Sequence, residues 1–283
     1  MKRRSFLYGR LAVVLAVLLS TTAPPTAGAT AIVAVRTPEA IGIAADSLVT
    51  VKGSSTPLTG QTECKIGEEG DVIFALAGLA AHPDRSFDLR RVIRSALADG
   101  GPTAADRVAS ATSTALKTEL TELRDKPPAL FDRFIAGRSG PLARVLLAAF
   151  SGETPWIEVF TFTGGNRDGQ TSVEVLRQRC PGACNPEKVI AVYLADGSPI
   201  EQALRSEKLA QERPEQAAGL LVKRVIETGA PGVGPPVDVV RIDRDGISWI
   251  ARKPSCCDDP EYAPEAGKSV QGDGESGLPL RTR

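Results

Sequence analysis

A predicted processing site lies directly in front of a predicted strand, and this junction sets where the folded chain begins. Residues 1–20 combine a basic start with the apolar run 11–19, and Ala27-Gly28-Ala29 has the small-x-small pattern that signal peptidase cleaves. Cleavage after Ala29 would make Thr30 the first residue of the mature protein. The sequence thus predicts a leader over residues 1–29 and a domain that opens on a strand.

The leader predicts export and no lasting membrane attachment. Its apolar run is shorter than the ~20 residues that cross a bilayer. The start Arg3-Arg4-Ser5-Phe6-Leu7 fits the twin-arginine pattern, whereas an ordinary basic segment before an apolar run would read similarly. We expect a periplasmic or secreted protein with no membrane association after the leader is removed.

Two predicted hairpins follow the junction. Residues 31–35 and 41–45 are predicted to form two strands joined by a turn at residues 37–39, and residues 64–66 and 72–77 form a second pair around the turn 67–70. Helical spacing of apolar residues then covers 84–99 and 103–124. The remaining predicted strands are 143–150, 156–162, 172–176, 189–194, 237–242 and 247–251, and the remaining helices are 199–210 and 214–228.

Pattern alone supports an α/β or α+β chain with one sizeable domain. The domain is expected over residues 30–252. From residue 253 to 283 Pro, Gly, Glu and Ser dominate and no apolar period survives, which predicts a disordered tail.

Four elements of the chain stand in an order that is known from one catalytic family. They are Thr30 at the predicted terminus, Asp46 in Ala44-Ala45-Asp46-Ser47, Lys65 in the second hairpin, and Gly78 within residues 76–81. In order and spacing they resemble the β-subunits of the proteasome and its bacterial two-component relative, which are N-terminal nucleophile (Ntn) hydrolases. The resemblance is strong over residues 30–81 and continues more weakly to Ile250.

The resemblance implies an α+β fold, a four-layer αββα sandwich, and a role for each residue. Thr30 would be the nucleophile, with its own α-amine, of ordinary pKa about 7.7–8.0, as the base. Lys65 would stay cationic and lower the cost of the alkoxide, while Asp46 would orient Lys65 and offset its charge. Gly78 would donate a backbone N–H to the oxyanion of the tetrahedral intermediate.

The chain departs from the family pattern in its later part. Family members carry a Ser in a Gly-Ser-Gly element, and the nearest match here is Ala195-Asp196-Gly197-Ser198, in which Ser198 or Asp196 would assist. Many members also place an Asp and a Ser before the last hairpin, and residues 230–236 contain neither. Ala29 stands where self-processing subunits carry Gly, which favours cleavage by signal peptidase.

Five cysteines in an exported chain indicate disulfides. Cys180 and Cys184 flank a tight loop and could close a small bridge, whereas Cys64 and the pair at 256–257 leave at least one thiol unpaired. The single histidine, His82, is remote in sequence, and no second cysteine pair stands at zinc-finger spacing, so no metal site is expected. One histidine and no Gly-x-Ser-x-Gly elbow also argue against a Ser-His-Asp or Cys-His mechanism.

These observations predict an exported threonine-type Ntn hydrolase that cleaves an amide, by preference a peptide bond, through an acyl-enzyme on Thr30, with no cofactor. Lys plus Arg and Asp plus Glu both number 34, so no basic field favours nucleic acid as a partner. The alternatives are hydrolysis of a small amide or acyl transfer on the same scaffold, and an inactive secreted module with a binding or structural role. Family members form rings, which leaves a homo-oligomer open.

Overall fold

The computed structural model describes residues 30–50, 57–81, 86–124, 141–167, 170–194, 197–206, 212–230 and 232–256. The predicted leader, His82, Asp196 and residues 257–283 lie outside this described part. None of the described helices is long and apolar enough to cross a membrane.

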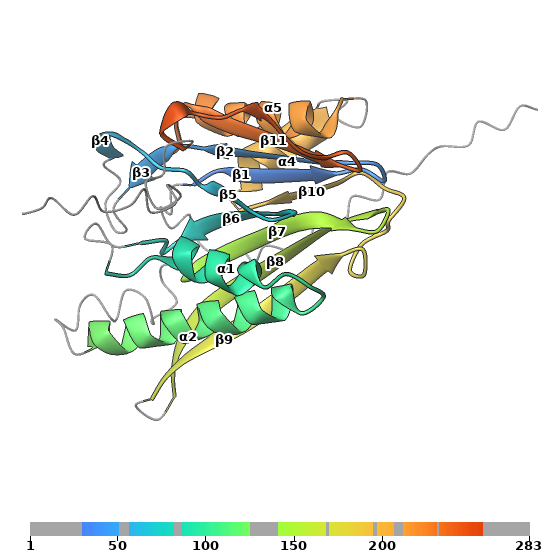
Figure 1. Cartoon of the computed structure of the whole chain (residues 1–283). Helices are drawn as coiled ribbons and strands as arrows, with labels where there is room; N and C mark the ends of the chain where they lie inside the picture. The colour runs from blue at the N-terminus through green and yellow to red at the C-terminus, as the bar shows by residue number, and fades with distance from the viewer. Residues whose placement is uncertain are drawn as a thin grey trace, which may run out of the picture.

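The chain combines α and β structure around two five-stranded antiparallel sheets (Figure 1). One sheet has the strand order β10-β1-β2-β11-β12, the other has the order β5-β6-β7-β8-β9, and β3 and β4 form a separate pair. The strands are β1 (Ile32–Arg36), β2 (Ile41–Asp46), β3 (Leu48–Thr50), β4 (Pro57–Thr62), β5 (Ile66–Glu69), β6 (Val72–Gly78), β7 (Ala143–Ser151), β8 (Thr154–Arg167), β9 (Gln170–Cys180), β10 (Ile190–Tyr193), β11 (Val237–Asp243) and β12 (Gly246–Ala251).

Within the described ranges, four α-helices and one short 3-10 helix accompany the sheets. They are α1 (Leu89–Ala98), α2 (Ala104–Arg124), α4 (Gly197–Ser206), α5 (Pro214–Glu227) and η2 (Pro254–Cys256). The side chain of Asp88 caps α1 by accepting from the N–H of Arg90, and α5 begins with a proline, which needs no N–H partner at that position.

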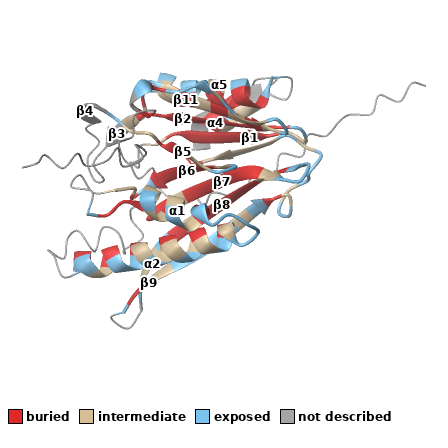
Figure 2. Cartoon of the chain, in the orientation of Figure 1, coloured by how far each residue is buried: buried red, intermediate tan, exposed pale blue. Residues whose placement is uncertain are grey.

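Three apolar clusters hold these elements together. The first joins α1 and α2 to β6, β7 and β8, the second lies between the two sheets, and the third joins β1 to α4 and α5. Successive side chains of a strand point to opposite faces, so Ile32 packs between the sheets while Val33 packs toward the helices. Figure 2 shows β1 and β7 buried along most of their length. Burial on both faces explains their nearly continuous apolar sequences.

α5 rests on β2 at a point where only glycine fits. A Cβ atom built on Gly42 would lie 2.2 Å from the backbone N of Glu215 in the first turn of α5. The absence of a side chain therefore sets the close approach of this helix to the sheet.

The order of strands and helices follows the predicted one, with three corrections. β3 and β4 were not predicted. β5 starts at Ile66, so Lys65 precedes the strand instead of lying in it. The β8–β9 pair runs past Phe162, where β7 ends its pairing, as a two-stranded ribbon without an apolar face to mark it.

The packed chain also reaches four residues beyond the predicted domain end. Lys253 and Cys256 are both buried, and residues 254–256 form η2. Composition did not reveal this end of the domain, because Lys253 and Cys256 are buried by contacts with residues far away in the sequence.

Candidate active site

Asp46 is the last residue of β2, and its buried carboxylate is the centre of the candidate site. Oδ1 accepts hydrogen bonds of 2.7 Å from the N–H of Ala31 and of 2.7 Å from Nζ of Lys65. Oδ2 accepts from the N–H groups of Leu48 and Gly234, each at 3.2 Å. A carboxylate that only accepts, from four donors, is in the geometry of its ionised form.

Strand pairing brings the start of the described chain to this carboxylate. In the β1–β2 hairpin Ile32 lies opposite Ala45, and the N–H of Asp46 donates to the carbonyl of Ala31 at 3.0 Å. Thr30 directly precedes Ala31 and is partly exposed. Thr30 is therefore the neighbour in sequence of Ala31, whose N–H donates to the same Asp46 oxygen that Lys65 contacts.

Lys65 lies at the edge of the other sheet, outside its strands. It directly precedes β5, and its carbonyl accepts from the N–H of Leu76 at 3.1 Å, which fixes the segment against β6. Its side chain is only 4% exposed and forms the ion pair with Asp46. The pair thus joins an end of β2 in one sheet to the start of β5 in the other.

Burial sets the charge balance of Lys65. Loss of hydration lowers the pKa of its ammonium below the ordinary value, and the negative charge of Asp46 opposes that shift. An unpaired ammonium at this depth would be strongly destabilising, so the carboxylate is what permits a cation there.

Gly78 ends β6 in a conformation that favours glycine. Its φ is +98°, and a Cβ atom would lie 2.5 Å from the carbonyl oxygen of Leu142. The residue is exposed and stands two positions after Leu76, about 7 Å along the strand from the amide that faces Lys65. The β5–β6 hairpin therefore brings Gly78 and Lys65 to the same end of the sheet.

Ser198 lies in the first turn of α4, and its side chain is outside the described part of the chain, as is all of Asp196. Assistance by either residue stays a prediction.

The loop before β11 contributes in a way that the sequence did not indicate. It lacks the expected Asp and Ser, yet the N–H of Gly234 donates to Asp46, and its carbonyl accepts from the N–H of Ser47 at 3.2 Å. Backbone groups of a Gly-Pro-rich loop have no side-chain signature, so motif matching does not detect them.

A second buried ion pair, between Lys253 and Asp238, lies next to the first and was also missed. Nζ of Lys253 donates to Asp238 and to the hydroxyl of Ser47, the neighbour of Asp46. The signal was present only as an isolated lysine at the start of a predicted tail.

Two disulfides are present in the described chain. Cys180 and Cys184 form the predicted small bridge, and Cys64, the neighbour of Lys65, pairs with Cys256. Within the described residues, no group of three or more His, Cys, Asp or Glu side chains could hold a metal ion.

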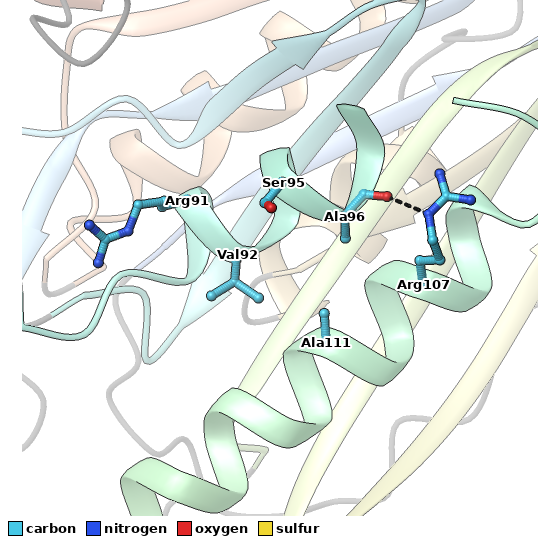
Figure 3. A pocket seen from close by; sticks show the side chains of 6 residues that line it. All are labelled: Arg91, Val92, Ser95, Ala96, Arg107 and Ala111. Carbon is cyan, nitrogen blue, oxygen red and sulfur yellow. Dashed lines mark hydrogen bonds between the residues drawn. The ribbon is translucent and has the colours of Figure 1, made fainter. Parts of the chain in front are cut away.

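A groove of about 460 Å³ lies on the surface between α1 and α2 (Figure 3), and none of the candidate residues lines it. Its lining includes Arg91, Ser95 and Arg107. Nε of Arg107 donates to the carbonyl of Ala96 at 2.9 Å, and Nη2 donates to that of Gly100 at 2.6 Å. This guanidinium is thus engaged in closing the α1–α2 turn.

Comparison with known proteins gives a structural likeness but no match by sequence. No family model matches the chain, and no curated protein matches it. A solved structure that it resembles is the Anbu (Gly-1) mutant from Hyphomicrobium sp. strain MC1, with a TM-score of 0.46 and 16% identity, over 79% of this chain and 87% of that one. The functional assignment accordingly rests on the geometry of the Asp46 site.

Proposed function

We propose that this chain is an exported Ntn hydrolase of four-layer αββα architecture that cleaves an amide bond through Thr30. The observation that carries the proposal is the shared oxygen of Asp46, which accepts at 2.7 Å both from Lys65 and from the amide next to Thr30. Removal of residues 1–29 would give Thr30 a free α-amine beside its hydroxyl, so one residue would hold both nucleophile and base.

The reaction follows from these groups. The Thr30 hydroxyl oxygen bonds to the substrate carbonyl carbon, and its proton passes to the α-amine. The Gly78 N–H stabilises the oxyanion, and the α-amine then protonates the leaving amine as the C–N bond breaks. Water, deprotonated by the α-amine, next attacks the ester on Thr30, releasing the acid and restoring the hydroxyl.

Lys65 and Asp46 act on this cycle through charge. A cation beside Thr30 would stabilise the developing alkoxide. The negative charge of Asp46 raises the pKa of the buried lysine and so favours its protonated form. A purely structural pair is the less economical explanation, because buried ion pairs contribute little net stability compared with apolar packing. A buried lysine whose pKa is shifted by burial and by a specific charge partner is typical of catalytic sites.

The substrate is an amide, and we favour a peptide. Small-amide hydrolysis, acyl transfer to another nucleophile, and an inactive binding module are the competing functions, and a substrate panel separates them. The panel contains peptides, small acyl amides, and acyl amides with an added amine acceptor.

The test is covalent labelling of protein whose N-terminus has been cut to Thr30. A peptide epoxyketone or β-lactone should add to Thr30, as located by peptide mass spectrometry, and the protein should hydrolyse a peptide amide. Thr30→Ala should remove both signals, whereas Thr118→Ala, at an exposed position of α2, should retain them. Native protein with a confirmed Thr30 terminus that resists the reagents and cleaves no amide would favour the binding module.

A further inference from the structure

Lys253 makes a buried ion pair that the proposed reaction does not use. Its Nζ donates to Oδ2 of Asp238 and to the hydroxyl of Ser47, and its backbone N–H donates to Oδ1 of Asp238 at 2.9 Å. Lys253 is 6% exposed and Asp238 is 1% exposed. Two buried lysine–aspartate pairs therefore stand beside each other at the end of β2.

A disulfide ties this pair to the candidate site. Cys256 bonds to Cys64, which directly precedes Lys65. The same cysteine closes η2, since its N–H donates to the carbonyl of Lys253 at 3.0 Å, and its Sγ lies 3.7 Å from Oδ2 of Asp238. The Cys64–Cys256 disulfide thus joins the two segments that carry Lys65 and Lys253.

Ser47 connects the second pair to the Asp46 carboxylate. Its hydroxyl accepts from Lys253, and its carbonyl accepts from the N–H of Glu63 at 2.8 Å. Its N–H donates to the carbonyl of Gly234, whose own N–H donates to Asp46. Displacement of Lys253 would therefore disturb Ser47, and with it the segments of Glu63 and Gly234 to which Ser47 is hydrogen-bonded.

The charges around Lys65 come from several elements. Asp46 at the end of β2 and Glu63 before β5 favour its protonated form, Glu63 being itself paired with Arg90 of α1. Burial is the largest influence and lowers the pKa of Lys65, and the positive charge of Lys253 lowers it further. Asp238 of β11 forms an ion pair with Lys253 and partly offsets its positive charge. A mature terminus would add a further charged group, the α-amine of Thr30.

We propose that Lys253, paired with Asp238 and fixed by the Cys64–Cys256 disulfide, is a positioning residue of this site. It holds Ser47 and the end of β2 in place, and its charge makes Lys65 give up its proton more readily. It acts on Thr30 only through Lys65 and Asp46, and this catalytic consequence rests on the proposed function.

The test measures the titration of Lys65 directly, by NMR of mature protein labelled at lysine with ¹³C and ¹⁵N. The Lys65 signals are assigned from their loss in Lys65→Met. Lys253→Met should shift the Lys65 titration to higher pH, because a neighbouring cation is gone. Lys253→Arg retains the charge and should leave the curve near its original position, as should Lys223→Met on the exposed face of α5.

A second variant covers failure of the single one to fold. Asp238→Asn combined with Lys253→Met removes both charges of the pair, so no buried carboxylate is left alone, and it should give a smaller upward shift. In folded protein, a Lys65 titration that coincides in wild type and in the charge-removing variants overturns the proposal, because a merely structural lysine would change stability and not this curve.

The titration does not depend on catalysis, so failure of the proposed function is recognised separately by absent labelling of the wild type. Where wild type is labelled, the alkaline limb of the labelling-rate profile should move upward with the Lys65 titration in Lys253→Met, and Lys253→Arg should restore it.

Discussion

Asp46 accepts hydrogen bonds from four stretches of chain, and this number of donors explains how a charge is held in a buried place. The donors are the amides of Ala31, Leu48 and Gly234 and the ammonium of Lys65. Each donor meets an oxygen that has no proton, so any change that introduces a donor there opposes at least one of them. The residue therefore fixes the geometry around Thr30 as well as the charge of Lys65.

Asp46→Asn should be strongly destabilising for this reason. The amide NH₂ of asparagine must face either the N–H pair of Leu48 and Gly234 or the donors from Ala31 and Lys65. We expect the free energy of unfolding to fall by about 3–5 kcal/mol, the range for breaking a buried ion pair. Urea unfolding at neutral pH measures the change.

Asp245→Asn is the matched control, because Asp245 is exposed in the β11–β12 turn. Its unfolding free energy should stay within about 0.5 kcal/mol of the original. Equal midpoints for Asp46→Asn and the control would contradict the four-donor description.

At the residue scale, the sequence indicated Asp46 and Lys65 through a resemblance, and the structure shows them in contact. The sequence did not indicate the contacts among Ser47, Asp238 and Lys253, because no short motif joins these residues. Lys253 and Ser47 are 206 positions apart. Such contacts follow from the packing of the β11–β12 hairpin beside β2, which only the folded chain displays.

Among the elements, α5 packs closely on β2 at Gly42. The Cβ of an alanine there would lie 2.2 Å from the backbone of Glu215, an atom that cannot rotate away. Gly42→Ala should therefore push α5 off the sheet and lower the unfolding free energy by about 1–3 kcal/mol or more. Thermal and urea unfolding both measure this loss.

Gly219→Ala supplies the control from the same interface. Gly219 lies within α5, and an added Cβ would meet a methyl group of Val239 at 3.6 Å, an ordinary contact. Alanine favours a helix over glycine by up to about 1 kcal/mol, so this variant should be neutral or more stable. A similar loss in both variants would show that the space at Gly42 is not what limits the helix.

Strands and helices with an apolar period were predictable as elements, and their ends were not. The hairpin of β1 and β2 was predictable from two short apolar runs, buried along their whole length, on either side of a turn. The ends of β8 and β9 were not, because beyond Phe162 their pairing is held by backbone hydrogen bonds in a ribbon whose described side chains are mostly polar and, apart from Thr171, partly or fully exposed. The short β3–β4 pair likewise has no apolar run to mark it.

For the whole molecule, the two disulfides differ in how much of the chain they close. Cys64–Cys256 spans 192 positions and fastens the last described residues to the segment before β5, whereas Cys180–Cys184 spans 4. A link that closes a long loop removes more conformations from the unfolded chain. The long disulfide should therefore dominate the stability that the cysteines contribute, besides holding Lys253 beside Ser47.

Cys64→Ser should consequently destabilise the protein more than Cys184→Ser, and both cysteines are partly buried, so loss of packing is similar. Loop entropy predicts a difference of about 3 kcal/mol between the two variants. Replacing Cys64 also avoids the rescue that Cys257 could give if Cys256 were changed. Urea unfolding without reductant measures the difference, and a dithiol reductant should abolish it, since it opens both bridges in every variant. Equal losses without reductant would mean that the long bridge does not restrain the unfolded chain, and that η2 is held by the Lys253–Asp238 pair alone.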